Sequence, residues 1–411
     1  MQTTTSSTLI GGGGLAAAAL IAGNLVGAGI LGLPINTGLA GFWPSMLAML
    51  AGGGLMYLTA IILGDEAAKS RSETFDYPSL YHRVLGKAGQ WIAILANLVI
   101  LYGLLTAYFA GGAKIIASLI GWESSETLVL VVFAILLIGL SCINLSLIER
   151  FNSLLMLLMI GSFAYLVFVG TGKIEPQRLT HLDWAFLPAT LPIIVTSFHF
   201  HNIIPTISTS LGWERVPFRR AVLLGMLLAF IMNGLWIFVG IGVIPLTGEP
   251  SILAAYESNI PATVPMAVIL QNSLFTLFAA FFALMAISTS FLANGLGLQG
   301  FLRDLFANTL GLHSRGLVLL ATFAPPLVTA LLYPDIFLKA LDLVGGVGIV
   351  VLFGLLPTLI LLRDRSRGSL LRLISVLGFL FALGILGLEI MQEAGWLALN
   401  PHVEYHTLGT D

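Results

Sequence analysis

Residues 22–34 read Ala-Gly-Asn-Leu-Val-Gly-Ala-Gly-Ile-Leu-Gly-Leu-Pro, and residues 196–205 read Thr-Ser-Phe-His-Phe-His-Asn-Ile-Ile-Pro. Each lies in a segment apolar enough to cross a bilayer, yet glycine costs about 1 kcal/mol and proline about 3 kcal/mol relative to alanine inside a helix. Hydrocarbon offers no water to freed backbone groups, so irregular backbone there must be buried in protein or line a cavity. Two broken spans at matching places in the chain predict a transporter-type binding site.

Composition places the rest of the chain in the membrane as well. Of the 411 residues, 57% are hydrophobic and 9% are charged, whereas soluble proteins carry about 25% charged residues. The chain is therefore predicted to be an all-α polytopic membrane protein in contact with the lipid bilayer. A net charge of −2 gives no reason to expect a nucleic-acid partner, and no obligate protein partner is evident. The single cysteine, Cys142, cannot form an internal disulfide.

Eleven segments satisfy the length requirement of about 20 mostly apolar residues for a membrane-spanning helix. Residues 1–8 are expected to form an N-terminal tail without a cleavable signal peptide, and 1–411 is expected to be one transmembrane domain. The predicted spans are 10–36, 43–64, 90–119, 127–147, 152–170, 186–211, 220–245, 265–296, 316–333, 338–361 and 371–392.

The distribution of basic residues predicts the orientation. If the N-terminus lies in the cytoplasm, fourteen of the 18 Lys and Arg residues fall on inside segments, as the excess of positive charge on cytoplasmic loops requires. A missed helix would reverse every later segment and blur this split. We therefore expect the N-terminus inside and the C-terminus outside.

The two broken spans divide the chain into repeats. Helices 1–5 occupy 9–170 and helices 6–10 occupy 186–361, while helix 11 at 371–392 lies outside both units. Because five is odd, the second unit enters the membrane from the opposite side, which gives a 5+5 inverted repeat with the broken helices facing each other. Many of the 45 glycines are equally consistent with helix packing. Gly27 and Gly29 differ, because Pro34 follows and helix 6 has a matching break.

The chemistry of the breaks favours a zwitterion. The N-terminus of a half-helix carries partial positive charge and suits a carboxylate. Exposed carbonyl groups and half-helix C-termini suit an ammonium group or a sodium ion. An α-amino acid presents both charges within a few ångströms, so it matches the pair of breaks better than a sugar or a simple anion.

Three motifs together resemble the hydroxy/aromatic amino acid permeases, a family within the amino acid–polyamine–cation superfamily that includes tryptophan and tyrosine permeases. They are 27–34, 196–205 and Ala-Ile-Ser-Thr-Ser-Phe-Leu at 286–292. The resemblance covers nearly the whole chain. It implies a leucine-transporter-type fold of 11 transmembrane helices, and ion-coupled import of amino acids across the inner cell membrane by alternating access.

The resemblance also implies a substrate site. Gly27, Ala28 and Gly29 would give N–H groups to the substrate carboxylate, and Thr196, Ser197 and Phe198 would face its amino group. The predicted site further includes Asn24, Tyr102, His199 and Phe200. In the aromatic permeases the helix 6 segment reads Ser-Phe-Gly-Phe-His, whereas this chain has His199 in place of the glycine. The imidazole would reduce the cavity volume or add a polar contact.

The coupling ion is left open between a proton and sodium. A histidine inside a span is a functional candidate and its ordinary pKa suits a proton carrier, although His201 also suits a structural bond to a freed carbonyl. Hydroxyl and carbonyl oxygens suit sodium, although hydroxyls often bond their own helix. The oxygens in question belong to Ser288, Thr289 and Ser290 on helix 8 and to Gly23 and Val26 on helix 1.

Phe198 and Asp342 are predicted to act as gates, although Asp342 also suits a helix cap in the headgroup region. No metal site and no cofactor beyond the coupling ion are expected. The sequence contains neither His-Glu-x-x-His nor Gly-x-Ser-x-Gly, so an enzyme is disfavoured. We therefore predict a symporter for aromatic amino acids, tyrosine or tryptophan. The alternatives are a symporter for small hydroxylated amino acids such as serine or threonine, and an uncoupled facilitator.

Overall fold

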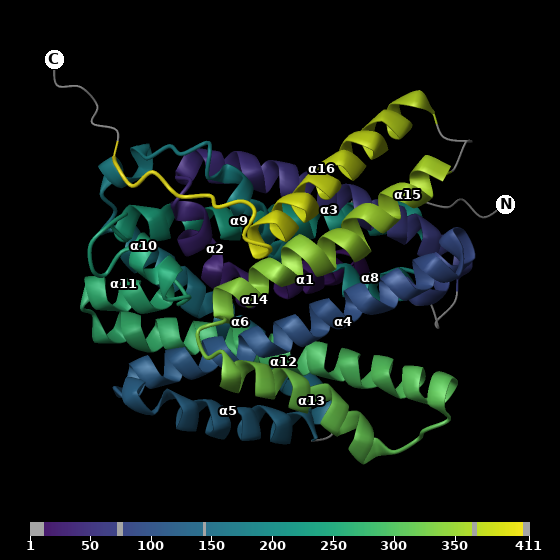
Figure 1. Cartoon of the computed structure of the whole chain (residues 1–411), viewed down its shortest axis with the longest axis horizontal. Helices are drawn as coiled ribbons and strands as arrows, with labels where there is room; N and C mark the ends of the chain where they lie inside the picture. The colour runs from purple at the N-terminus through teal and green to yellow at the C-terminus, as the bar shows by residue number, and fades with distance from the viewer. Residues whose placement is uncertain (1–11, 72–76, 143–144, 364–367, 406–411) are drawn as a thin grey trace.

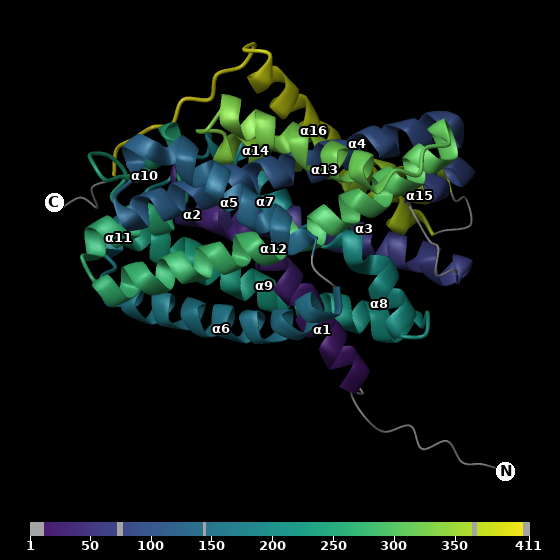
Figure 2. The same cartoon turned by 90° about the horizontal axis from the view of Figure 1, so that it is seen from below.

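A computed structural model describes residues 12–71, 77–142, 145–363 and 368–405. Most of the described chain is helical, and the long helices run roughly lengthwise through the molecule, as Figure 1 shows. The described chain begins at one end of this bundle and finishes at the other (Figures 1 and 2). We call the end where α1 begins the N-side, and the end where α2 finishes the C-side.

The elements, with 3-10 and π segments labelled η, are α1 (Gly12–Leu25), α2 (Ala28–Gly38), α3 (Phe42–Ser70), α4 (Tyr77–Ile120), η1 (Glu123–Ser125), α5 (Glu126–Ser141), α6 (Leu145–Thr171), η2 (Pro176–Thr180), η3 (Leu187–Thr190), α7 (Leu191–Ser197), η4 (His201–Ile203), α8 (Ile204–Ser210), α9 (Arg215–Val243), α10 (Ile252–Glu257), α11 (Thr263–Leu270), α12 (Ser273–Leu310), α13 (Arg315–Leu332), α14 (Phe337–Leu343), η5 (Val344–Leu355), α15 (Leu356–Arg363) and α16 (Ser369–Glu393).

Nine helical runs in the described part of the chain are long and apolar enough to cross a membrane, and α1 with α2 makes a tenth if the bent pair is one span. The expected span 152–170 falls in α6, whose described apolar stretch is Leu158–Thr171. The all-helical, multi-pass architecture is thus confirmed. The count of eleven spans and the 5+5 inverted repeat stay predictions.

Both expected breaks are present. Helix α1 ends at Leu25 and α2 begins at Ala28, and the two helices meet at an angle of 56°. Gly27 between them has an extended backbone with φ −103°. In the sixth span, α7 ends at Ser197, residues 198–200 are not helical, and the short turn η4 leads into α8. Figure 2 shows α1 leaning out of the bundle at the N-side.

Several predicted boundaries differ from the structure, most clearly those of the fourth and eighth spans. The eighth span was expected over 265–296, but it begins at Ser273 because the side chain of Asn272 caps α12 by accepting a bond from the Phe275 amide at 3.0 Å. Gln271, with φ +47°, ends the separate helix α11. The fourth span was expected to reach 147, but α5 ends at Ser141.

On the C-side the two broken spans pack directly on each other. A Cβ atom added at Gly29 would lie 3.2 Å from Cα of Ser197, so glycine permits this close approach. A Cβ atom at Gly345 in η5 would lie 1.9 Å from the carbonyl oxygen of Pro192 in α7. The loop before α11 adds a backbone bond of 3.0 Å from the Ala262 amide to the Leu31 carbonyl in α2. The C-side halves of both broken spans are therefore held by backbone contacts.

Candidate functional site

A cavity of about 220 Å³ lies at the two breaks. Its walls come from α1, the start of α2, α4, α6, the break between α7 and α8, and α12. The lining residues are Leu20, Gly23, Asn24, Leu25, Gly27, Gly29, Leu104, Tyr108, Met159, Thr196, His199, Asn202, Ile203, Thr289, Ser290, Ala293 and Asn294. Because α1 and η4 contribute to the walls and α2 contributes only Gly29, the cavity lies on the N-side of the breaks.

Three buried polar side chains give this cavity its chemistry. The Asn294 amide nitrogen donates to the Ser290 carbonyl at 2.8 Å and to the Tyr108 hydroxyl at 3.3 Å. The Asn294 amide oxygen and Nε2 of His199 have no hydrogen-bond partner in the described structure, although each residue is only 8% exposed. Buried polar groups in proteins are nearly always hydrogen-bonded. These two atoms therefore suit a polar ligand or water in the cavity.

The break in helix 1 adds backbone groups to the cavity. The first N–H groups of a helix have no partner inside that helix, and those of α2 begin at Ala28, between the lining residues Gly27 and Gly29. A Cβ atom at Gly27 would lie 2.9 Å from Oγ of Ser290, so the break packs directly against α12. The helix start favours an anionic group, and its glycines leave room for one.

Eight of the residues predicted from the sequence line this cavity. They are Gly23, Asn24, Gly27, Gly29, Thr196, His199, Thr289 and Ser290. The hydroxyls of Thr196 and Thr289 already donate to backbone, to the Leu341 carbonyl at 2.9 Å and to the Met285 carbonyl at 2.8 Å respectively. They can thus offer the cavity their oxygen lone pairs, which suit a cation or an ammonium group.

Tyr102 and Ser197 do not line the cavity, and their hydroxyls are bonded elsewhere. The Tyr102 hydroxyl donates to the Ala321 carbonyl in α13 at 2.7 Å. The Ser197 hydroxyl donates to the Ile194 carbonyl of its own helix at 2.8 Å. Val26 and Ser288 are also absent from the walls, and Val26 is buried in the apolar core.

The two phenylalanines of the helix 6 break also point away from the cavity. The ring of Phe198 lies over Gly53 of α3, 3.4 Å from the position of an added Cβ atom, and beside Phe230 of α9. Phe200 is fully buried and contacts the ring of His201. In this conformation both rings are buried and neither bounds the cavity, so their role in substrate binding stays a prediction.

His201 is likewise fully buried outside the cavity. Its Nε2 lies 3.0 Å from the Thr59 hydroxyl of α3, and its ring stacks on Phe353 of η5. Its carbonyl accepts a hydrogen bond from the Tyr77 hydroxyl at the start of α4. The ring of His201 thus bonds a hydroxyl of α3 and not a freed carbonyl of the broken helix, and its Nδ1 has no hydrogen-bond partner in the described structure.

Asp342 lies apart from the cavity, on the C-side. Both of its carboxylate oxygens accept from Nδ2 of Asn36 in α2, at 2.9 and 2.8 Å. This contact joins α2 to α14 and is placed where a gate residue is expected to act. Sequence reasoning missed Asn36, although a polar residue two positions after Pro34 in an apolar span is a visible signal.

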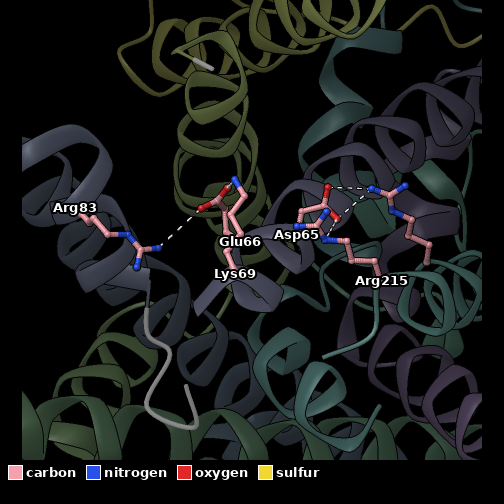
Figure 3. A network of polar contacts seen from close by, with 6 residues as sticks. Asp65, Glu66, Lys69, Arg83 and Arg215 are labelled. Atoms are coloured by element: carbon pink, nitrogen blue, oxygen red, sulfur yellow. Dashed lines mark hydrogen bonds and ion pairs between the residues drawn. The ribbon is translucent and has the colours of Figure 1, made fainter. Parts of the chain in front are cut away.

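A network of charged side chains holds the helices together at the N-side (Figure 3). Asp65 in α3 accepts from Arg219 of α9 at 2.9 and 3.1 Å, and Arg215 approaches it to 3.8 Å. The neighbouring Glu66 pairs with Lys69 at 2.5 Å and faces Arg83 of α4 at 3.9 Å. The end of α3 is thereby tied to both α9 and α4.

Several lining residues were not selected from the sequence. Tyr108 of α4 reaches the cavity, whereas Tyr102 of the same helix, which the sequence predicts, does not. Asn294 lies four residues after Ser290, and residues at this spacing share a helix face, so the helix 8 motif could have identified it. Asn202 and Met159 carried no comparable signal.

Comparison with known proteins gives the class of protein that the sequence predicts, a membrane transporter. The chain is 28% identical over 335 residues to tyrosine-specific transport system 1 of Haemophilus influenzae, covering 79% of this chain and 82% of that protein. It is 28% identical over 362 residues to a tryptophan-specific transport protein of Pseudomonas aeruginosa, covering 85% of each chain.

Among solved structures, MHP1, a nucleobase-cation-symport-1 family transporter in a closed conformation with bromovinylhydantoin bound, aligns with a TM-score of 0.61 at 15% identity. The alignment covers 95% of this chain and 94% of that chain, which shows a shared fold. The chain is thus a multi-pass membrane transporter and not an enzyme. Because the tryptophan/tyrosine permease model matches residues 12–391, the chain belongs to the tryptophan/tyrosine permease family.

Proposed function

We propose that this protein imports aromatic amino acids, tyrosine or tryptophan, across the inner cell membrane with a coupling ion and by alternating access. The named specificities of its relatives support the aromatic substrate. The cavity at the two breaks supplies the geometry for an amino acid. In this proposal the N-side faces the cytoplasm, as the distribution of basic residues predicts.

The observation that carries the proposal is the set of unsatisfied polar groups around the cavity. The N-terminus of α2 forms one part of the cavity wall. Elsewhere on the wall, Nε2 of His199 and Oδ1 of Asn294 have no hydrogen-bond partner in the described structure. A zwitterion satisfies both kinds of group at once, because its carboxylate accepts from backbone N–H groups and its ammonium donates to Oδ1. An apolar solute would leave all of them unpaired, at about 1–3 kcal/mol for each group.

Sodium and a proton remain alternative coupling ions, and each would bind to different residues. Ser290 and Thr289 place oxygens beside Gly23 and Gly27 on the wall, which suits sodium and its preference for hard oxygen ligands. His199, with a free ring nitrogen on the same wall, suits a proton. The helix 6 histidine that reaches the cavity is His199, so it replaces His201 as the proton carrier in this proposal.

Alternating access requires the two ends to open in turn. In the present conformation α2 and α7 are closed on the C-side by the contacts of Gly29 and Gly345. The cavity instead extends toward α1 and η4. We infer that import begins from a second conformation, in which α2 separates from α7 and α14.

Uptake by the purified protein in lipid vesicles tests the proposal. Radiolabelled tyrosine, tryptophan and serine should be offered under a proton gradient, under a sodium gradient and under neither, with protein-free vesicles as the control. Accumulation of tyrosine or tryptophan above equilibrium under one gradient alone is the expected result. Equal uptake without a gradient would mean an uncoupled facilitator, and accumulation of serine alone would overturn the aromatic substrate.

A further inference from the structure

The contact between Asn36 and Asp342 uses only half of the Asn36 amide. Its nitrogen donates to both oxygens of Asp342, at 2.9 and 2.8 Å. Its oxygen Oδ1 has no hydrogen-bond partner in the described structure, although Asn36 is only 1% exposed. A buried acceptor without a donor costs about 1–3 kcal/mol. The site therefore lacks one hydrogen-bond donor.

A proton on Asp342 supplies the missing donor. An ionised carboxylate only accepts hydrogen bonds, whereas a protonated carboxyl has one O–H donor and still accepts. A neutral carboxyl facing a primary amide therefore forms two complementary hydrogen bonds, one N–H to carboxyl oxygen and one O–H to amide oxygen. A small rotation of either side chain converts the observed contact into this pair, and both polar atoms of Asn36 are then satisfied.

The surroundings of Asp342 also disfavour its negative charge. Asp342 shares a cavity of about 290 Å³ with Glu389 and Glu393 of α16. Glu389 is 5% exposed, and its side chain lies against Gly346 of η5, within 2.9 Å of the position of an added Cβ atom. Two carboxylates that share a site disfavour ionisation of both.

The nearby cations do not offset this negative charge. Lys339 on α14 is paired with Glu393 at 3.2 Å, and Lys114 of α4 is bound to Asp335 and to the Ser258 carbonyl. The α7 and η5 segments contain no ionisable residue.

A tyrosine of the short helix α10, which lies outside the membrane-spanning segments, is affected by the same negative charges. It contributes Tyr256 and Glu257 to this cavity. Burial, and then the charges of Asp342 and Glu389, raise the pKa of Tyr256 above its ordinary range. Every charged group that faces Asp342 is therefore an acid or a base already paired.

We propose that Asp342 is a proton-binding site on the C-side, and that the protonated Asp342–Asn36 pair closes this side of the transporter. The proton comes from the solution on the C-side and binds one carboxylate oxygen of Asp342. Its loss leaves Oδ1 of Asn36 unsatisfied and exposes the charge of Asp342 to Glu389, so α14 and α2 separate. The role of this closure in transport rests on the proposed function, whereas the proton site itself does not.

Infrared difference spectra of the purified protein between mildly alkaline and mildly acidic buffer test the site directly. A protonated buried carboxyl gives its own carbonyl band. We expect this band in the wild type, its loss in Asp342→Asn, and its retention in the matched control Asp304→Asn, which removes an exposed carboxylate of α12 outside this cavity. Absence of the band in the wild type, or its full retention in Asp342→Asn, would overturn the proposal.

Glu389→Gln keeps the test decisive if Asp342→Asn does not fold. Removal of the neighbouring negative charge should make the band appear only at a proton concentration about tenfold higher. A complete loss of the band in Glu389→Gln would place the proton on Glu389 and overturn the assignment to Asp342.

Transport gives a readout that separates the two proposals. In vesicles, tyrosine uptake should depend on pH at the C-side, and Asp342→Asn should lose that dependence. If the infrared band behaves as expected while no aromatic amino acid is transported, the proposed function fails and the proton site stands. If aromatic uptake occurs but Asp342→Asn keeps the wild-type pH dependence, the role in closure fails alone.

Discussion

The two ends of the bundle are held together in different ways. At the N-side, the partly exposed arginines Arg215 and Arg219 bind Asp65, and the contact joins long side chains. The C-side also contains the ion pairs Lys114–Asp335 and Lys339–Glu393. The broken spans themselves, however, meet there through glycines that bring backbone onto backbone, and the amide of Asn36 binds Asp342. Charged side chains separate readily and respond to salt, whereas backbone packing is set by shape. From this difference we propose that the N-side opens by loosening ion pairs, whereas opening of the C-side requires whole half-helices to move.

The largest expected effect is at the closest backbone contact of the C-side. Gly345→Ala places a Cβ atom 1.9 Å from the Pro192 carbonyl and 2.4 Å from Oγ1 of Thr196. Overpacking of this kind costs about 3 kcal/mol or more when backbone must move, so the yield of folded protein and the melting temperature in detergent should fall sharply. Gly384→Ala in α16 is the matched control, because nothing lies within 4 Å of its added Cβ atom. Equal melting temperatures of the two variants would show that close backbone packing at Gly345 does not hold the C-side closed.

The second effect concerns the ion pairs of the N-side. Asp65→Asn removes the charge that two arginines share, and we expect a loss of about 1–2 kcal/mol in stability, measured by thermal unfolding. Raising salt from about 0.1 M to 1 M shortens the screening length from about 10 Å to 3 Å, which should destabilise the wild type more than Asp65→Asn.

Arg220→Gln is the control for this N-side prediction. Arg220 is exposed, and no ion pair of it is found in the described part of the chain. A loss of stability in Arg220→Gln as large as in Asp65→Asn would mean that net charge, and not the Asp65 contact, stabilises this end.

A third prediction tests whether the substrate binds in the cavity beside the helix 1 break. Gly27→Ala inserts a methyl group 2.9 Å from Oγ of Ser290, which narrows the wall beside the start of α2. We expect about tenfold weaker binding of the aromatic substrate, which corresponds to about 1.4 kcal/mol, measured by competition against labelled tyrosine. Adding Ser290→Ala should restore part of the affinity, while Gly300→Ala in α12, where the added atom meets nothing, should leave affinity unchanged. Wild-type affinity in Gly27→Ala would move the site away from the helix 1 break.

The smallest expected effect separates two tyrosines of the same helix. Tyr108 lines the cavity, whereas the hydroxyl of Tyr102 is bound to Ala321. Tyr108→Phe should weaken binding about two- to tenfold through the loss of one hydrogen bond, and Tyr102→Phe should not change affinity. The reverse result in the same competition assay would favour the assignment made from the sequence.

Local chemistry explains why much of the fold was predictable. The breaks follow from glycine and proline in apolar segments, and these are properties of a few adjacent residues. Gly23, Gly27 and Thr196 reach the cavity because their positions are tied to those breaks. Helix ends were harder to predict, because the cap at Asn272 interrupts an apolar run that composition alone reads as continuous.

The remaining features depend on contacts between distant parts of the chain. Asn36 and Asp342 are 306 positions apart, and Asp65 and Arg219 are 154 apart, so neither pair has a local signal. The choice between Tyr102 and Tyr108 depends on the rotation of α4 about its axis, which its neighbours determine. The directions of Phe198, His199 and Phe200 depend on unwound backbone, for which helical periodicity gives no guide.

The π-helix η5 lies between contacts at the two ends of the bundle. Its 12 residues continue α14 beyond Asp342 and end at Leu355. Within η5, the carbonyl of Leu352 accepts from the Tyr81 hydroxyl of α4 at 2.8 Å. Each residue of a tighter α-helix turns the chain by about 100°, more than a residue of a π-helix, so any rewinding of η5 rotates one end of the tenth span against the other. A rotation of this kind would connect Asp342 on the C-side with Tyr81 near the start of α4 on the N-side.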